Sequence, residues 1–249
     1  MKLRKIKNAQ ADVLSYEYCQ VPSAKTVVVM FGGYQSQMIG GKSDSVKKWC
    51  ADWGVSFLRF DYSAHGFSEG VWEDSTLKTW IEDARLILTE CEEESKFFVG
   101  SSMGAWIASH LALERQDLKA LVTIAGAFDF TEEVIKARLT DAYKESLLEK
   151  GYFEHETIYD DEPYKITQDF INSGEAHRLF TREVIFPCPV ILLHGDEDLD
   201  IPWELSLRMS QHCQAPSLQF KLLKGKNHRL CDDESLAILK VSIEEVLGA

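Results

Sequence analysis

Residues 100–104 (GSSMG) contain the pattern G-x-S-x-G in a single register, with Ser102 as the central serine. An apolar run, 96–99, precedes the pattern and a helical pattern follows it, which predicts a sharp strand–turn–helix. Such a turn exposes its serine on a strained backbone, and only very small residues fit two positions before and after it. Gly100 and Gly104 meet that requirement, so Ser102 is predicted to be a nucleophile. The structural alternative is a glycine-rich helix start that is capped by a serine.

A serine is a weak nucleophile unless a base takes its proton, and the base needs a carboxylate to orient it. In chains with this type of turn, the acid and then the base follow the serine. Residues 194–202 read HGDEDLDIP after an apolar run, so three aspartates compete for the role of acid. Asp198 is favoured because it is the third residue after the glycine and is followed by an aliphatic–proline pair that starts the next helical pattern. Asp196 and Asp200 are predicted to be turn and capping residues.

The base is predicted to be His228, which follows the last apolar run in the loop 224–228 (KGKNH), just before the last helical pattern. Of the seven histidines, this one alone has both the chain order and the loop position. His65 is a rival in a turn after another apolar run, but it precedes the serine, and we expect it to be a structural hydrogen-bonding residue. The other histidines are expected to pack or form hydrogen bonds (His110, His194) or to face solvent (His155, His177, His212).

Attack on a carbonyl creates an oxyanion, which needs two preorganised N–H donors. One is predicted to be the backbone N–H of Met103, directly after the candidate nucleophile. The other is predicted to be the backbone N–H of Tyr34, in the loop 31–36 (FGGYQS) that follows an early apolar run. The two glycines of this loop let the backbone curve toward a substrate. An ordinary Gly-Gly turn is the structural alternative.

These residues must be positioned by a regular framework, and the chain alternates short apolar runs with longer helical patterns. The runs are apolar on both sides of the strand, which is typical of a parallel sheet covered by helices on both faces. The predicted strands are 25–31, 54–60, 96–99, 118–124, 189–193 and 217–223. The predicted helices are 77–91 with Ser75 as N-cap, 102–113, 202–213 and 232–246. This alternation predicts a doubly wound α/β fold with a mostly parallel sheet.

The alternation stops between residues 128 and 186, where charges and aromatic residues are frequent and no strand is evident. The stretch is too long for a connecting loop, so we interpret it as a mainly helical lid inserted into the core. The core is then formed by residues 1–127 and 187–249. Ligand sites of α/β folds lie where such a segment would emerge from the sheet. The alternative is a solvated acidic appendage.

Composition restricts the partners and the compartment. The chain of 249 residues carries a formal net charge of −13, which disfavours nucleic acid and anionic membranes as partners. No apolar run is long enough to span a bilayer, and the basic start lacks the apolar stretch of a secretory signal. The six cysteines lack metal-ligand spacing, so we expect reduced thiols, no metal site and a cytoplasmic location.

Several segments together resemble the serine α/β-hydrolase superfamily over nearly the full length of the chain. Within it, the chain is similar to the branch of mitochondrial palmitoyl-protein thioesterases, also described as acyl-glucuronide esterases, and their bacterial relatives. The resemblance is carried by FGGYQSQMIGGK (31–42), FLRFDYSAHGFSEG (57–70), VGSSMGAW (99–106), CPVILLHGDEDLDIPW (188–203), KNHR (226–229) and, in the insertion, YDDEPYKITQDFINSGEAHRLF (159–180).

The resemblance implies that Ser102 is the nucleophile, Asp198 the acid and His228 the base, with Tyr34 and Met103 as oxyanion donors. It further implies a cofactor-free serine hydrolase that cleaves carboxylic esters or thioesters through an acyl-enzyme. The substrate would be a small molecule or an acylated protein. Two alternatives use the same fold: a carbon–carbon bond hydrolase of the meta-cleavage type, and a non-catalytic member that binds a ligand without turnover.

The chain departs from the family pattern at two places. Ala105 stands where a third glycine is common, which predicts mild crowding at the start of the helix after the turn. The front end lacks the long mitochondrial presequence of the branch, so the expectation of a cytoplasmic location is kept.

Overall fold

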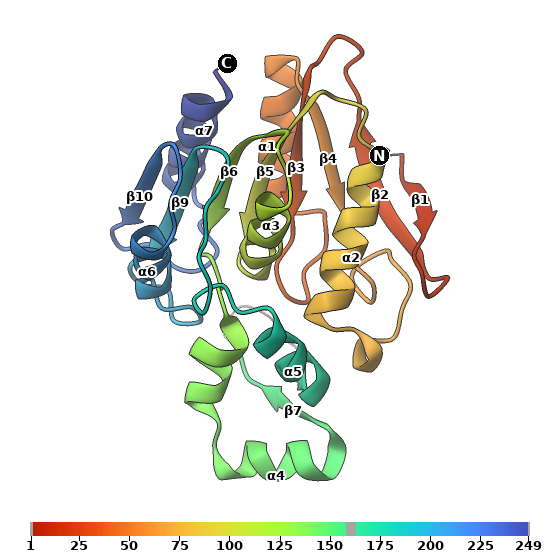
Figure 1. The fold of residues 1–249 in the computed structure, drawn as a ribbon, viewed down its shortest axis with the longest axis vertical. Helices are drawn as coiled ribbons and strands as arrows, with labels where there is room; N and C mark the ends of the chain where they lie inside the picture. Colours follow the sequence, from red (N-terminus) through yellow and green to blue (C-terminus); the bar gives the residue numbers. More distant parts are fainter. Residues whose placement is uncertain (1, 158–162, 249) are drawn as a thin grey trace.

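The computed structural model describes residues 2–157 and 163–248. Its centre is an eight-stranded sheet with the strand order β1-β2-β4-β3-β5-β6-β9-β10 (Figure 1). The first two strands are antiparallel to their neighbours, and the other six run parallel to one another. The strands are β1 (Arg4–Lys7), β2 (Val13–Cys19), β3 (Thr26–Phe31), β4 (Ser56–Phe60), β5 (Ser95–Ser101), β6 (Leu118–Ile124), β9 (Val190–Gly195) and β10 (Leu218–Leu223).

Two hydrophobic clusters lie on opposite faces of this sheet. One packs against helices α2 (Leu77–Ile87), α3 (Met103–Leu113) and α6 (Glu204–His212). The other packs against α1 (Gly41–Trp53) and α7 (Asp233–Leu247). Strands β3, β4 and β9 are buried along their whole length, as expected for a parallel sheet between two layers of helices. The prediction of a doubly wound, mostly parallel sheet is therefore confirmed.

Three elements of the core were missed by the sequence-based prediction, namely β1, β2 and α1. Strand β1 is the four-residue segment RKIK and is largely exposed, so it shows no apolar run. Helix α1 begins at a glycine and is rich in Lys and Ser, which hides its buried stripe of Ser43, Val46 and Cys50. The predicted N-cap of α2 was wrong by one residue, because Thr76, not Ser75, accepts from the backbone N–H of Thr79.

The insertion between β6 and β9 contains strands as well as helices. Residues Thr131–Ile135 form a π-helical turn, and α4 (Asp141–Lys150) and α5 (Gln168–Ala176) follow. Between these helices, β7 (Tyr152–His155) pairs antiparallel with β8 (Tyr164–Thr167). The expectation that this region lacks strands was therefore wrong: each strand has only four residues, too few to show a period. Residues 158–162, part of the predicted lid and of the segment that carries the family resemblance, lie outside the described residues.

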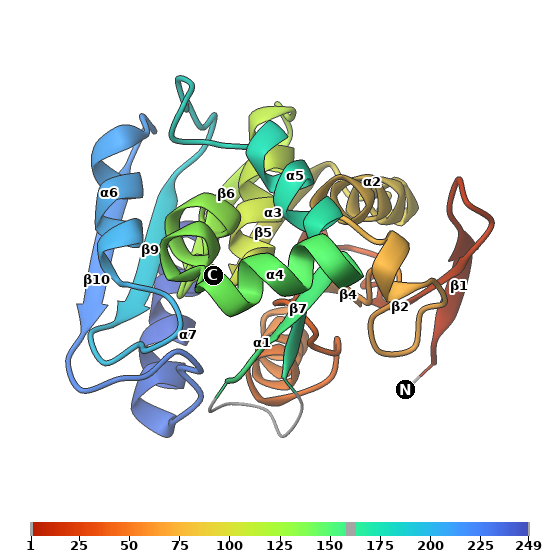
Figure 2. The ribbon, with the colours of Figure 1, turned by 90° about the horizontal axis from the view of Figure 1, so that it is seen from below.

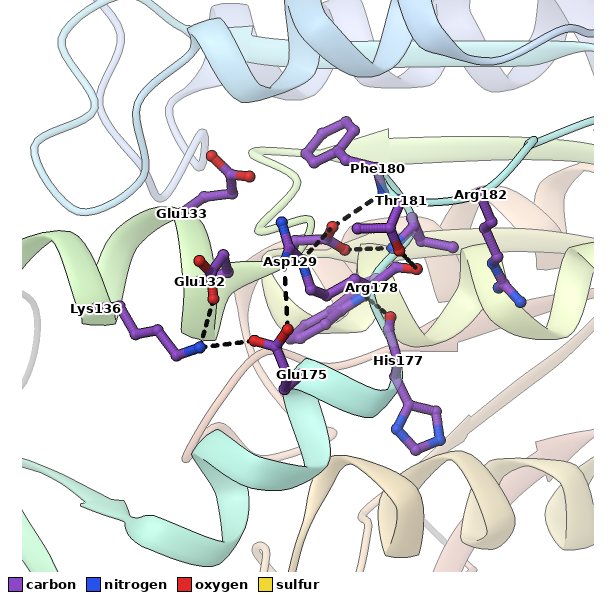
Figure 3. A network of polar contacts seen from close by, with 12 residues as sticks. Asp129, Glu132, Glu133, Lys136, Glu175, His177, Arg178, Phe180, Thr181 and Arg182 are labelled. Atoms are coloured by element: carbon purple, nitrogen blue, oxygen red, sulfur yellow. Dashed lines mark hydrogen bonds and ion pairs between the residues drawn. The ribbon is translucent and has the colours of Figure 1, made fainter.

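The insertion lies across one end of the sheet, as the view from below shows for α4, α5 and β7 (Figure 2). Hydrogen bonds and ion pairs join the beginning of the insertion to its end. The buried carboxylate of Asp129 accepts from the backbone N–H groups of residues 179 and 180, at 2.7 and 3.0 Å. Lys136 binds Glu132 and Glu175, each at 2.6 Å (Figure 3). The insertion is thus a closed unit at its base.

Two further observations bear on the environment of the protein. The six cysteines are free thiols, and Cys231 is the exposed one among them. Within residues 2–157 and 163–248, no helix has the length and apolar character that crossing a membrane requires.

Candidate active site

Ser102 occupies the sharp turn between β5 and α3. Its backbone has φ 54° and ψ −121°, a left-handed conformation that is strained for a residue with a side chain. The turn is fixed to the neighbouring strand β6, because the N–H of Ser102 donates to the carbonyl of Ile124 at 2.9 Å. A Cβ on Gly100 would lie 2.6 Å from the carbonyl oxygen of Gly104. A Cβ on Gly104 would lie 2.3 Å from the carbonyl oxygen of Phe31, so both glycines are required sterically.

The structure brings Ser102, His228 and Asp198 together from three separate loops. The Oγ of Ser102 lies 3.1 Å from Nε2 of His228, and Nδ1 of His228 lies 2.6 Å from Oδ2 of Asp198. Since Nδ1–H donates to the carboxylate, Nε2 is left as the acceptor for the serine hydroxyl. The loops also pack closely, since a Cβ on Gly195 would lie 2.1 Å from the carbonyl oxygen of Lys226.

The Asp198 carboxylate is buried and accepts four hydrogen bonds. Its Oδ1 accepts from the backbone N–H groups of Asp200 and Ile201, at 3.0 and 2.8 Å. Its Oδ2 accepts from His228 and, at 3.0 Å, from Nε2 of His194. Burial alone would raise the pKa of Asp198, but the hydrogen bonds from the two histidines outweigh it and bring the pKa to about 2. Asp198 is therefore ionised at neutral pH.

The other two aspartates of this segment have different surroundings. Asp196 accepts from the backbone N–H of Gly225 at 2.5 Å and from Nζ of Lys224, which agrees with a turn residue. Asp200 does not cap α6, whose N-cap is Trp203, and it lines the cavity over Ser102 instead. The choice of Asp198 among the three agrees with its contact to His228.

Tyr34 and Met103 both present backbone N–H groups beside Ser102. Among the described residues, neither N–H has a hydrogen-bond acceptor. Met103 is the first residue of α3, where backbone N–H groups lack partners within the helix. The loop that carries Tyr34 passes close to the serine, because a Cβ on Gly33 would lie 3.3 Å from Cβ of Ser102.

His65 supports this loop from the core. Its Nδ1–H donates to the carbonyl of Ser63 at 3.0 Å, so its Nε2 accepts from the backbone N–H of Gln35 at 3.2 Å. Gln35 has a left-handed φ of 51°, and this hydrogen bond stabilises it. Burial lowers the pKa of His65 to about 4, so the ring is neutral. The structural role expected for His65 agrees with these contacts.

The remaining histidines divide differently from the expectation. His110 and His194 are buried and form hydrogen bonds, as expected. The expectation that the other three face solvent was wrong, since each is half-buried. Nδ1 of His177 donates to the carbonyl of Ser173, Nε2 of His212 lies 2.8 Å from the carbonyl oxygen of Arg182, and His155 lines the cavity over Ser102. The position of His155 in the cavity was not predicted, because it depends on the β7–β8 hairpin, which the sequence analysis missed.

The cavity over Ser102 has a volume of about 470 Å³. Its wall combines the loop 32–40, the start of α1, the turn at Ser102, the His228 loop and residues of the insertion. Phe130 and Tyr164 contribute apolar surface from the insertion, and charge comes from Lys42 and Arg59 of the core and from Arg138 of the insertion. Lys42 and Arg59 were not identified from the sequence, because α1 was not predicted and Arg59 lies in an apolar strand.

Comparisons with known proteins agree with the fold described above. Residues 22–152 match the family described as "Serine aminopeptidase, S33". The mitochondrial palmitoyl-protein thioesterase ABHD10 of Mus musculus is 32% identical over 240 residues, which cover 96% of this chain and 80% of the relative. A solved hydrolase structure from Agrobacterium vitis S4 has a TM-score of 0.94 and 32% identity, covering 98% of both chains. The alpha/beta hydrolase domain-containing protein 10 from mouse has a TM-score of 0.90 and 29% identity, covering 100% of this chain and 99% of its own.

Proposed function

The chain belongs to the serine aminopeptidase S33 family, within the α/β-hydrolase superfamily that its motifs predicted, and from this premise we propose that it hydrolyses carboxylic esters or thioesters. The observation that carries the proposal is the continuous series of hydrogen bonds from Ser102 through His228 to Asp198, at 3.1 and 2.6 Å. Such a series turns a weakly nucleophilic hydroxyl into an attacking group at neutral pH.

In the proposed reaction, Oγ of Ser102 attacks the acyl carbonyl and its proton passes to Nε2 of His228. The negative charge that develops on the carbonyl oxygen is stabilised by the backbone N–H groups of Tyr34 and Met103. His228 then returns the proton to the leaving alcohol or thiol, which leaves an acyl-enzyme on the serine. A water molecule, deprotonated by His228, attacks the acyl-enzyme; the bond to Oγ of Ser102 breaks, His228 returns the proton to Oγ, and the carboxylic acid is released. Asp198 remains ionised throughout and holds the imidazole in its orientation.

We infer that the substrate is an acylated small molecule or an acylated protein. The curated relatives are named palmitoyl-protein thioesterases, which supports a thioester of a protein. The cavity volume of about 470 Å³ lies within the range of small-molecule sites, and Phe130 and Tyr164 give it an apolar wall. In this proposal residues 128–186 act as the lid over a core of residues 1–127 and 187–249.

The test is turnover of an ester series and a thioester series from acetyl to palmitoyl. We expect Ser102→Ala to lower kcat by at least about 10³-fold on every substrate that the wild type turns over. Ser109→Ala is the matched control, because Ser109 is a buried serine of α3 whose hydroxyl bonds to the carbonyl of Ala105. A wild type without turnover of any acyl substrate would contradict the proposal and favour a carbon–carbon bond hydrolase or a non-catalytic ligand-binding protein.

We also propose that the protein works in a reducing compartment such as the cytoplasm. The six free thiols support this, because disulfides are rare in such compartments. The curated relatives are mitochondrial by name, and that location is theirs.

A further inference from the structure

The backbone of Tyr34 lies in a loop of the core, and its side chain contacts the insertion. Its hydroxyl donates to the backbone carbonyl of Lys165 in β8, at 2.5 Å, across 131 positions of sequence. The indole Nε1–H of Trp72 donates to the same carbonyl at 2.9 Å. One carbonyl of the insertion therefore binds two side chains of the core.

The ring of Tyr34 is enclosed by aromatic residues from both regions. It meets Trp72 of the core edge-on with 5.1 Å between ring centroids. From the insertion, Tyr164 and Phe170 approach it with centroid separations of 5.6 and 5.1 Å. The side chain is 8% exposed, and burial raises the pKa of Tyr34 well above its ordinary value, so the hydroxyl stays protonated and able to donate. The ring has little freedom to move independently of the insertion.

We propose that the insertion positions the oxyanion site, with the carbonyl of Lys165 and the indole of Trp72 orienting the backbone N–H of Tyr34. This inference rests on the proposed function. The Tyr34 side chain and N–H leave adjacent backbone atoms, so fixing the ring on β8 restrains the direction of the N–H. The following residue, Gln35, is fixed from the other side by His65. The donor is thus held between the core and the insertion.

The arrangement gives the insertion a role that does not depend on acyl-chain length. An N–H donor stabilises an oxyanion only when it is aimed at the position where the charge develops. A lid that only contacts the acyl chain influences the hydrolysis of long-chain esters and leaves the hydrolysis of an acetyl ester unchanged. A lid that aims the donor affects every substrate, including an acetyl ester too short to use an acyl wall.

Tyr34→Phe removes the hydroxyl and keeps the backbone donor, so it tests the proposal directly. We expect kcat on an acetyl ester to fall about 10-fold with KM within twofold of wild type. We expect the affinity for propylboronic acid, which forms a tetrahedral adduct on serine, to fall by the same factor. Tyr18→Phe is the matched control, because the buried hydroxyl of Tyr18 binds Glu93 away from the site. This control should lower the unfolding midpoint and keep kcat within twofold.

Hydrogen exchange of the backbone amides in residues 33–38 is the second measurement, and it needs no turnover. We expect faster exchange there in Tyr34→Phe than in wild type, with no change in Tyr18→Phe. In an active enzyme, an unchanged kcat of Tyr34→Phe on the acetyl ester would overturn the inference. A rise in KM that is confined to long-chain esters would overturn it as well. If the wild type is inactive, the proposed function fails, and unchanged exchange would then reject the positioning role separately.

Discussion

The hydroxyl–imidazole–carboxylate side of the site and its oxyanion side differ in what holds them in place. Ser102, His228 and Asp198 lie on core loops that pack backbone against backbone, as at Gly195 and Lys226. The loop of Tyr34 also meets this framework through the carbonyls of Phe31 and Gly32, but it is held in addition by side chains, from His65 in the core and through the Lys165 carbonyl in the insertion. One side therefore lies within a single framework, whereas the other depends in addition on directional contacts between two regions.

The largest effect is expected from a substitution on the core side alone, that is, on the hydroxyl–imidazole–carboxylate side of the site. Asp198→Asn keeps the shape of the side chain but removes the charge that orients and stabilises the imidazole of His228. We expect kcat to fall about 10³-fold to 10⁴-fold with little change in KM. Steady-state kinetics on an acetyl ester measures this. Exchange of the amides in residues 33–38 should stay as in wild type, and a large change there would contradict the separation of the two sides.

A substitution at Gly104 should disturb both sides together, because a Cβ there would overlap the carbonyl oxygens of Phe31 and Gly32. We expect Gly104→Ala to lower the free energy of unfolding by about 3 kcal/mol. Gly41→Ala is the control for stability, since its Cβ would meet only the side chain of Cys231, with Sγ at an ordinary 3.5 Å. Chemical denaturation compares them, and equal midpoints for the two variants would refute the steric argument.

A smaller effect should follow from removing one donor to the carboxylate. His194 is fully buried, and its Nε2–H donates to Asp198 while Ser206 contacts its Nδ1 at 2.7 Å. His194→Leu should lower kcat about 10-fold and move the ascending limb of the pH–rate profile to higher pH, because a more basic carboxylate holds the proton on the base more tightly. Ser206→Ala, which leaves this donor in place, should change kcat less. A pH–rate profile of His194→Leu that overlays the wild type would reject the role.

A gradual effect is expected in the pH dependence of stability, from the two buried neutral histidines. Burial lowers the pKa of His65 to about 4 and that of His110 to about 3, below the value of 6.5 for an unperturbed histidine. At a pH between 6.5 and these lowered pKa values, the unfolded chain binds more protons than the folded one, so stability falls as the pH drops below about 6.5. We expect about 1 kcal/mol of loss per pH unit for each histidine. Urea titrations from pH 7 to 4.5 measure the slope, which His65→Gln should reduce.

The core side of the site could be predicted because its signals are local in sequence. The glycines around Ser102 and the turn that contains Asp198 each lie within a few residues of the side chain that they position. The parallel sheet was equally evident, since β3, β4 and β9 are continuous apolar runs. The α/β-hydrolase fold and the family resemblance followed from these segments and were confirmed by the comparisons.

The support of the oxyanion side could not be predicted, because it arises from contacts between distant residues. Tyr34 was selected for its backbone, and no pattern connects its hydroxyl to a carbonyl 131 positions away. The acceptor lies in β8, a four-residue strand that buries Ile166 but is too short to show an alternating pattern. The placement of His155 in the cavity was missed for the same reason.

The closed base of the insertion has a consequence for recombining members of this family. Asp129 and the ion pairs of Lys136 join the beginning of the insertion to its end, so residues 129–180 form a cassette with both cut points at one place. Such a cassette can be exchanged without altering the strands on either side. It carries the Lys165 carbonyl with it, however, and leaves Tyr34 and Trp72 behind in the host. A chimera that keeps its catalytic rate therefore has to match these two side chains to the incoming hairpin, whatever the acyl chain it was built to accept.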